Sequence, residues 1–264
     1  MLGLICIDVD GTLVGSSNEV APAVWEAAER ARAAGIRLSL CSGRPAYGRA
    51  LGYARQLDPQ GWHIFQNGAS IVNVQTLASS SEALPQDRLL ELVATSRRLE
   101  RVLEVYTDSD YAVESDTPLA VKHAALLGLP YRRRDPLSLP GQVVRAQWVI
   151  PQEETEQLLD EPHEGLALHP ASSPGMPGIM FVSVTREGVG KGSAVLEVAT
   201  RYGLDPDRVM MVGDGHNDVT AMRVVGHPVA MGNADPQALA ASRYRVGRVD
   251  DGGLIEALEL ARTL

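Results

Sequence analysis

The sequence predicts an α/β fold in which a doubly wound, Rossmann-like parallel-sheet core is interrupted by an inserted α/β cap domain. Residues 1–82 alternate short apolar runs with amphipathic stretches, and the same alternation returns over residues 180–264. This alternation is typical of strand–helix–strand units with helices on the faces of a parallel sheet. Residues 83–179 are richer in polar and long side chains, and their alternating runs indicate half-exposed antiparallel strands. We therefore expect residues 1–82 and 180–264 to form the core and residues 83–179 to form the cap.

The first core segment contains three expected strands separated by two helices. Each strand is a short apolar run, and the first helix is an amphipathic stretch that stops at Gly35. The expected strands are residues 4–9, 36–41 and 62–66, and the expected helices are residues 20–34 and a segment that opens at Pro45.

The same patterns predict the helices and strands of the cap and of the second core segment. The cap is expected to contain a helix at 86–101 and antiparallel strands in the runs VLEVYTDSDYAVE and QVVRAQWVI. The Pro- and Gly-rich run PASSPGMPG predicts a hinge, after which a strand from about residue 179 is expected to lead back into the core. The remaining expected elements are helix 191–202, strand 208–212, a helix that begins near His216, strand 228–231 and closing helices.

The composition is that of an ordinary folded protein and argues against several classes. Of the 264 residues, 45% are hydrophobic and 22% are charged, so a disordered chain is not expected. The net charge of −9 argues against a general nucleic-acid-binding protein, because a phosphate backbone needs a basic surface. The apolar runs are too short to span a membrane, and the first residues lack the basic region of a signal peptide. With Cys6 and Cys41 expected as reduced, buried thiols, we expect a cytoplasmic protein, monomeric or weakly homodimeric, without membrane partners.

The first expected strand leads into two carboxylates, Asp8 and Asp10. At a separation of about 4 Å and an effective dielectric constant of about 20, two like charges repel by about 4 kcal/mol, so a cation is expected beside them. The segments CSGRP, GVGKGSA and GDGHND also lie at the ends of expected strands or at the helix starts that follow. Because ligands bind beyond the carboxyl ends of strands in an open parallel sheet, we expect these segments to meet at one site. Hard carboxylate oxygens suit Mg²⁺.

In this order, DVDGTL, CSGRP, the lysine of GVGKGSA and GDGHND resemble the four motifs of the haloacid dehalogenase-like superfamily. The runs FQNGA and AMGNADP are similar to those of its Cof-type sugar-phosphatase branch. The resemblance covers about residues 1–82 and 180–264, and the middle of the chain resembles a C2-type cap by position and length. It implies a Mg²⁺-dependent phosphatase that hydrolyses a small phosphate monoester, such as a sugar phosphate or another small phosphorylated metabolite, through an aspartyl phosphate.

The roles of the two aspartates follow from their chemistry and agree with this resemblance. An aspartate with an ordinary pKa near 4 is ionised at neutral pH, so Asp8 can attack phosphorus without a base. Asp10 is the candidate general acid for the leaving group and then the general base for water. Mg²⁺ would be held by Asp8, the backbone carbonyl of Asp10 and Asp214, while Asp218 would orient a metal-bound water or Lys191.

A further set of residues is expected to bind the substrate phosphate. Lys191 would supply a positive charge at a helix N-terminus, and Ser42 would donate its hydroxyl to a phosphoryl oxygen. The expected substrate-binding residues are Ser42, Gly43, Arg44, Lys191 and Asn217.

The core motifs leave two other functions open. A phosphotransferase of the phosphomannomutase kind shares this core and a similar cap, and differs in whether water reaches the aspartyl phosphate. A non-catalytic regulator that binds sugar phosphates is the other alternative, although the presence of every core chemical residue argues against it. Within residues 84–177, the sequence identifies no side chain that selects the leaving group.

Overall fold

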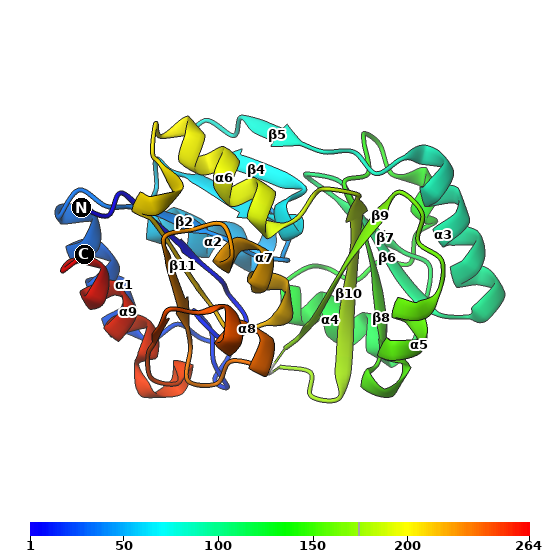
Figure 1. The fold of residues 1–264 in the computed structure, drawn as a ribbon. Helices are drawn as coiled ribbons and strands as arrows, with labels where there is room; N and C mark the ends of the chain where they lie inside the picture. The colour runs from blue at the N-terminus through cyan, green and yellow to red at the C-terminus, as the bar shows by residue number, and fades with distance from the viewer. Residues whose placement is uncertain (174) are drawn as a thin grey trace.

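A five-stranded parallel sheet forms the core, and an antiparallel sheet lies at the opposite end of the molecule (Figure 1). The computed structural model describes residues 1–173 and 175–264. The first strand, β1, lies between β11 and β2 and pairs in parallel with both. Because the chain winds outward from β1 in both directions, the expected doubly wound core is confirmed. In spatial order the strands are β13 (Tyr244–Arg245), β12 (His227–Ala230), β11 (Val209–Gly213), β1 (Leu4–Ile7) and β2 (Arg37–Leu40).

The third expected strand, β3 (Trp62–Phe65), joins the core sheet through one parallel bridge, between Cys41 and Ile64. It then pairs antiparallel with β4 (Ser70–Asn73), which in turn pairs with β5 (Ser79–Ser81). A tight turn rather than a crossover helix connects β3 to β4, so the chain has to reverse direction here.

Helices cover both faces of the core sheet, because alternate residues of β1 point to opposite sides. Ile5 and Ile7 pack in one apolar cluster with α1, α2 and α9, whereas Leu4 and Cys6 pack in another with α6, α7 and α8. Cys41 joins the second cluster, so both cysteines are buried thiols, as expected. The helices are α1 (Pro22–Ala33), α2 (Gly48–Leu57), α6 (Lys191–Arg201), α7 (Val219–Met222), α8 (Pro236–Ala241) and α9 (Gly253–Ala261).

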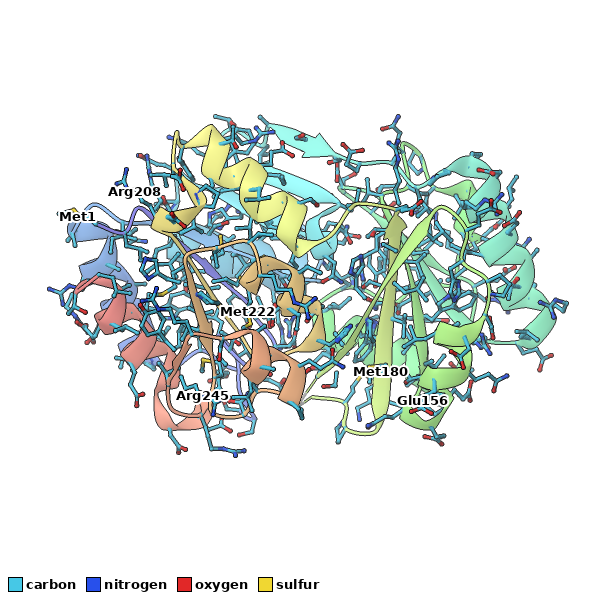
Figure 2. The ribbon with its side chains drawn as sticks, in the orientation of Figure 1. Met1, Glu156, Met180, Arg208, Met222 and Arg245 are labelled. Atoms are coloured by element: carbon cyan, nitrogen blue, oxygen red, sulfur yellow. The ribbon has the colours of Figure 1, made fainter. Side chains whose placement is uncertain are left out.

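The cap is a five-stranded antiparallel sheet with helices on both faces. Helices α3 (Gln86–Leu99) and α5 (Thr155–Asp160) pack on its outer face, and α4 (Pro118–Leu127) packs on the face turned toward the core (Figure 1). Side chains fill both parts of the molecule, with Met222 buried in the core and Glu156 exposed on α5 (Figure 2). In spatial order the strands are β7 (Tyr111–Val113), β6 (Val102–Tyr106), β8 (Arg145–Pro151), β10 (Ile179–Arg186) and β9 (Leu166–Ser172).

The structure corrects the position at which the chain returns to the core. The strand expected to lead back from residue 179 is β10, which pairs on both sides with cap strands, β8 and β9. An apolar run such as IMFVSV is equally suited to the middle of a covered antiparallel sheet, which is why its pattern was misleading. The run PASSPGMPG therefore begins as the last three residues of β9 and leads toward β10, and its residue 174 lies outside the described residues. We infer that the cap extends through Arg186, beyond the expected boundary at residue 179.

The expected helix near His216 is instead a 3-10 turn (His216–Asp218) that leads into the short helix α7. The short turn keeps Asp218 close to the end of β11, because a 3-10 turn needs only three residues. The other 3-10 turns are Gln66–Gly68, Pro136–Ser138, Gln152–Glu154, Pro206–Arg208 and Val249–Asp251.

One buried histidine couples the stability of the core to pH. The backbone N–H of Leu40 donates to Nδ1 of His63 (2.9 Å), so Nε2 carries the hydrogen and donates to the backbone oxygen of Asp58 (2.9 Å). Burial lowers the pKa of His63 to about 4. Below about pH 6.5 the unfolded chain binds a proton at this imidazole that the folded protein binds only below about pH 4. This contribution to stability is therefore complete above pH 6.5 and is lost as the pH falls toward 4.

We expect the wild type to lose about 2 kcal/mol more of its unfolding free energy than His63→Asn between about pH 7.5 and pH 5. Urea denaturation of both proteins at the two pH values measures this difference. The buried His169, whose pKa is also lowered to about 4, is present in both proteins, so the comparison isolates His63. Equal losses in the two proteins would contradict the prediction.

Candidate active site at the carboxyl edge of the core sheet

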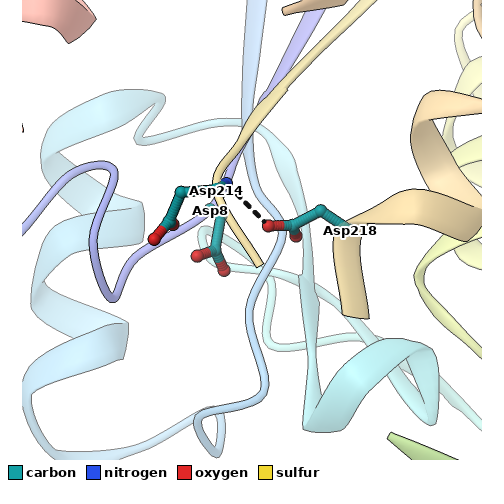
Figure 3. A group of neighbouring side chains, drawn as sticks. All are labelled: Asp8, Asp214 and Asp218. Atoms are coloured by element: carbon teal, nitrogen blue, oxygen red, sulfur yellow. Dashed lines mark hydrogen bonds between the residues drawn. The ribbon is translucent and has the colours of Figure 1, made fainter. Parts of the chain in front are cut away.

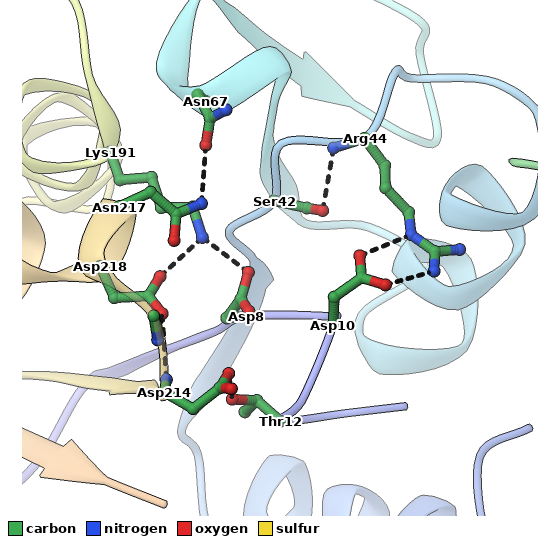
Figure 4. A network of polar contacts seen from close by, with 11 residues as sticks. Asp8, Asp10, Thr12, Ser42, Arg44, Asn67, Lys191, Asp214, Asn217 and Asp218 are labelled. Atoms are coloured by element: carbon green, nitrogen blue, oxygen red, sulfur yellow. Dashed lines mark hydrogen bonds and ion pairs between the residues drawn. The ribbon is translucent and has the colours of Figure 1, made fainter. Parts of the chain in front are cut away.

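The structure brings the four polar segments together at the carboxyl ends of β1, β2 and β11 (Figure 4). Lys191 is buried at the start of α6, and its Nζ donates to Oδ1 of Asp8 and Oδ1 of Asp218, each at 2.6 Å. Burial alone would lower the pKa of Lys191, but the two carboxylates raise it above its ordinary value. The ammonium is therefore permanently charged and links β1 to the turn after β11.

Asp218 has no free carboxylate oxygen. Its Oδ1 accepts from Lys191, and its Oδ2 accepts from the backbone N–H groups of Asp214 and Gly215, each at 3.0 Å. These contacts fix Lys191 and the backbone of Asp214 relative to each other.

Asp8, Asp214 and Asp218 form a compact acidic group (Figure 3). One oxygen from each lies within 4.8 Å of the others. Burial, together with the neighbouring Asp218, raises the pKa of Asp8 to about 7, and burial, Asp8 and Asp218 raise the pKa of Asp214 well above its usual value. The ordinary pKa expected for Asp8 is therefore wrong for the site without a cation. Three carboxylates face one ammonium, and this deficit of positive charge, with hard oxygen donors, fits a divalent cation such as Mg²⁺.

Two residues that the sequence analysis did not assign hold Asp214 in place. Thr12 donates its hydroxyl to Oδ1 of Asp214 (2.9 Å), and Asn233 donates to Oδ2 (3.2 Å) and to the backbone oxygen of Gly11 (2.8 Å). Both lie in runs already noted, DVDGTL and AMGNADP. Their position in those runs was the only signal for their role.

The carboxylate of Asp10 belongs to a separate set of contacts. Arg44 donates to it from Nε (2.9 Å) and Nη2 (2.8 Å), and Ser173, from the loop between β9 and β10, donates from Oγ (2.9 Å). Burial alone would raise the pKa of Asp10, but Arg44 and Ser173 outweigh it and lower the pKa. Arg44, expected at the substrate phosphate, is therefore committed to Asp10 in this structure. No sequence signal pointed to Ser173.

Of the remaining expected phosphate-binding residues, Ser42 and Gly43 lie in the loop after β2 and Asn217 lies in the turn after β11. Oγ of Ser42 accepts from the backbone N–H of Arg44 (3.0 Å), which leaves its hydroxyl hydrogen free to donate. A Cβ at Gly43 would come within 2.9 Å of Nδ2 of Asn67, so this loop packs closely on the Asn67 side chain. Asn217 donates to Oδ1 of Asn67 (3.1 Å), a residue of the FQNGA run whose Asn-Gly pair is foremost a turn signal and secondly a candidate substrate contact.

A cavity of about 510 Å³ separates the core site from the cap. Asp8 and Asp10 lie in its core wall. The cap contributes residues from α4, β8, β9, β10 and the segment 152–159. Among them are His123, Arg145, Gln147, Phe181 and Ser183, for which the sequence offered no signal. No helix in the described part of the chain is long and apolar enough to cross a bilayer.

Known proteins match this chain in sequence and in fold over nearly its whole length. The Bacillus subtilis (strain 168) protein YxeH is 26% identical over 265 residues, 98% of this chain and 97% of its own. YwtE of the same organism, a 5-amino-6-(5-phospho-D-ribitylamino)uracil phosphatase, is 26% identical over 95% of this chain and 94% of its own. A haloacid dehalogenase-like hydrolase from Bacteroides thetaiotaomicron superposes with a TM-score of 0.84 at 26% identity, covering 98% of this chain and 99% of its own.

The family described as haloacid dehalogenase-like hydrolase matches residues 5–258. This range includes the cap as well as the core, so the match does not rest on the core motifs alone. The chain therefore belongs to the haloacid dehalogenase-like hydrolase family, as one of its phosphatases.

Proposed function

We propose that the protein hydrolyses a small phosphate monoester, a sugar phosphate or a related organic phosphate, with Mg²⁺ and through an aspartyl phosphate on Asp8. The supporting observation is that Asp8 and Asp10, both in the wall of one cavity, have different partners. Asp8 is bound by Lys191 beside Asp214, whereas Asp10 is bound by Arg44 and by a serine of the cap. These different partners support a division of roles in which Asp8 attacks phosphorus and Asp10 transfers the proton.

The proposed Mg²⁺ ligands are Asp8, Asp214 and the backbone carbonyl of Asp10. When bound, Mg²⁺ would neutralise charge on the transferring phosphoryl group. Lys191, Ser42, Asn217 and the backbone N–H of Gly43 would bind the phosphoryl oxygens, because they surround the same edge of the sheet. Arg44 would act on Asp10 instead.

Asp8 has one carboxylate oxygen available for attack. Oδ1 accepts from Lys191, whereas Oδ2 accepts no hydrogen bond from residues 1–173 or 175–264. In the first step Oδ2 forms a bond to phosphorus, the bond from phosphorus to the leaving-group oxygen breaks, and that oxygen takes a proton from Asp10. The products of this step are the dephosphorylated alcohol and the aspartyl phosphate.

In the second step a water attacks phosphorus, gives a proton to Asp10 and displaces Oδ2 of Asp8, which releases inorganic phosphate. Asp10 is then protonated again and the cycle is closed. Arg44 and Ser173 favour the ionised form of Asp10, which is the form that accepts this proton. A phosphate dianion bound beside Asp10 would favour the protonated form that the first step needs, because like charges repel.

The residues that select the substrate are expected in the cap. Relatives of similar length are named for different organic phosphates, among them YwtE above and the HMP-PP phosphatase of Serratia proteamaculans (strain 568), which is 27% identical over 90% of this chain. Because the core motifs are a common feature of the family, the choice of leaving group would fall to the cavity residues of the cap.

We expect Asp8→Asn to reduce phosphate release by about 1,000-fold or more, because the amide cannot form the phosphoenzyme. The measurement is inorganic phosphate released from p-nitrophenyl phosphate and from a panel of sugar phosphates, with isomerised sugar phosphate measured in parallel to detect a phosphotransferase. Asp207→Asn, the same change at an exposed position, serves as the control. Near-normal release by Asp8→Asn would contradict the mechanism.

We expect Mg²⁺ to raise the melting temperature of the wild type and EDTA to abolish its activity. At a concentration about 100 times the Kd, a bound ion stabilises the folded state by about 2.7 kcal/mol. Asp214→Asn should bind Mg²⁺ more weakly and show a smaller shift, measured by differential scanning fluorimetry without substrate. Equal shifts in both proteins would remove Asp214 from the metal site, and unchanged turnover in EDTA would exclude a required metal.

A further inference from the structure

The cap face that turns toward the cavity carries a row of polar side chains where a buried sheet would ordinarily be apolar. Glu104 of β6 lies opposite Gln147 of β8, which lies opposite Ser183 of β10, which lies opposite His169 of β9. All four are buried. The neighbouring residues on the other face of the same strands, such as Trp148 and Val182, pack in the apolar cluster under α3. Buried polar groups cost free energy unless they are hydrogen bonded, so this row requires an explanation.

Arg145 lies beside this row, is 1% exposed and lines the cavity. Its Nε donates to Oε1 of Gln66 (2.7 Å), and its Nη1 donates to Ser183 (3.0 Å) and to Gln147. The guanidinium also lies 3.9 Å from the centre of the Tyr106 ring. These partners are all uncharged.

The charge balance of Arg145 differs from that of the other buried cations. Lys191 pairs with Asp8 and Asp218, and Arg44 pairs with Asp10. Among the described residues, no carboxylate oxygen lies within 4.0 Å of the Arg145 guanidinium, and its Nη2 donates no hydrogen bond. Burying an arginine without a carboxylate in contact is costly, and such a group favours an anion that reaches it.

Glu104, the nearby buried acid, is already fully occupied. It accepts from Nδ1 of His123 (2.8 Å), from the Tyr106 hydroxyl (2.6 Å) and from Nε2 of Gln147 (3.1 Å). It does not line the cavity, whereas Arg145 does. On the cap side, the positive charge of Arg145 therefore faces the cavity, whereas the negative charge of Glu104 lies outside the cavity lining.

The guanidinium is held from both parts of the molecule. Gln66 belongs to the core turn between β3 and β4, where its φ of 56° is in the left-handed region. It accepts from Arg145 and donates from Nε2 to the backbone oxygen of Thr107 in the cap (3.1 Å). Arg145 is thus fixed in orientation before a ligand arrives, which reduces the entropic cost of binding.

Part of the cap wall beside these groups is apolar, although Gln152, Thr155 and Ser172 also line the cavity. Leu127, Met180 and Phe181 line it, and the Phe181 ring stacks on His123 with centroids 4.5 Å apart. A ligand suited to this wall has a carbon body between its two polar ends.

We propose that Arg145, aided by Gln147 and Ser183, binds a second anionic group, a carboxylate or a second phosphate, on the leaving group of the substrate. The preferred substrates are then small phosphate monoesters with negative charge at both ends and a short carbon body between them. This inference rests on the proposed phosphatase function and adds the class of leaving group.

The first test uses the wild type and matched pairs of probes. The carboxylate pair is 3-phosphoglycerate and glycerol 3-phosphate, and the phosphate pair is fructose 1,6-bisphosphate and fructose 6-phosphate. We expect kcat/KM to be about 10- to 100-fold higher for the anionic member of at least one pair, and the pair that shows it identifies the anion. Equal or lower values for both anionic probes would overturn the inference while leaving phosphatase activity established. No phosphate release from any probe, including p-nitrophenyl phosphate, would overturn both.

The second test assigns the preference to Arg145. Arg145→Gln should lower the ratio of kcat/KM between anionic and neutral probes by about 10-fold or more, chiefly through KM for the anionic probe, and Arg145→Lys should retain part of the ratio. Arg133→Gln, at an exposed cap arginine outside the cavity, should keep the wild-type ratio. A ratio unchanged in Arg145→Gln would overturn the assignment. The wild-type comparison still decides the inference if that variant does not fold.

Discussion

The buried ion group formed by Lys191, Asp8 and Asp218 is the interaction on which the rest of the site depends. It joins three segments that are far apart in the chain, the end of β1, the start of α6 and the turn after β11. Removing one partner from a buried ion pair leaves an uncompensated charge, which costs about 3–5 kcal/mol. The same ammonium holds Asp8 and, through Asp218, the backbone of Asp214. The positions of the proposed nucleophile and of the proposed metal ligands therefore depend on each other.

Close backbone packing places Lys191 at this point. A Cβ at Gly68, whose φ is 97°, would come within 2.2 Å of the backbone oxygen of Gly190, so the FQNGA turn packs directly on the start of α6. A Cβ at Gly192 would come within 2.6 Å of the backbone oxygen of Thr220, so the first turn of α6 packs equally closely on α7. These contacts require glycine and leave the helix start little freedom to shift.

Hydrogen bonds between the core and the cap connect the two proposed parts of the site. Ser173 reaches Asp10 from the cap, and Gln66 reaches Arg145 from the core. The cap position is therefore linked both to the proposed proton-transfer group and to the proposed leaving-group site. Cavity closure by the cap would exclude water while it completes both sets of contacts.

Elements whose signal is local could be predicted well from the sequence. The strand before Asp8 and the helix that begins at Lys191 lie where periodicity and turn residues placed them. The sheet to which residues 179–186 belong could not be predicted, because an apolar run does not reveal its partners. The same is true of the antiparallel pairing of β3 with β4.

The sequence by itself determined the family, the core fold and the residues of the four motifs, because these depend on short runs whose order is itself informative. Only the tertiary structure decided that Arg44 pairs with Asp10, that Ser173 joins them, and that Arg145 faces the cavity with uncharged partners. Those contacts join residues 34, 163 and 79 positions apart. The order of the motifs predicted which core segments meet, but not which side chains pair within the site, and the contacts of Ser173 and Arg145 are created by the packing of the cap on the core.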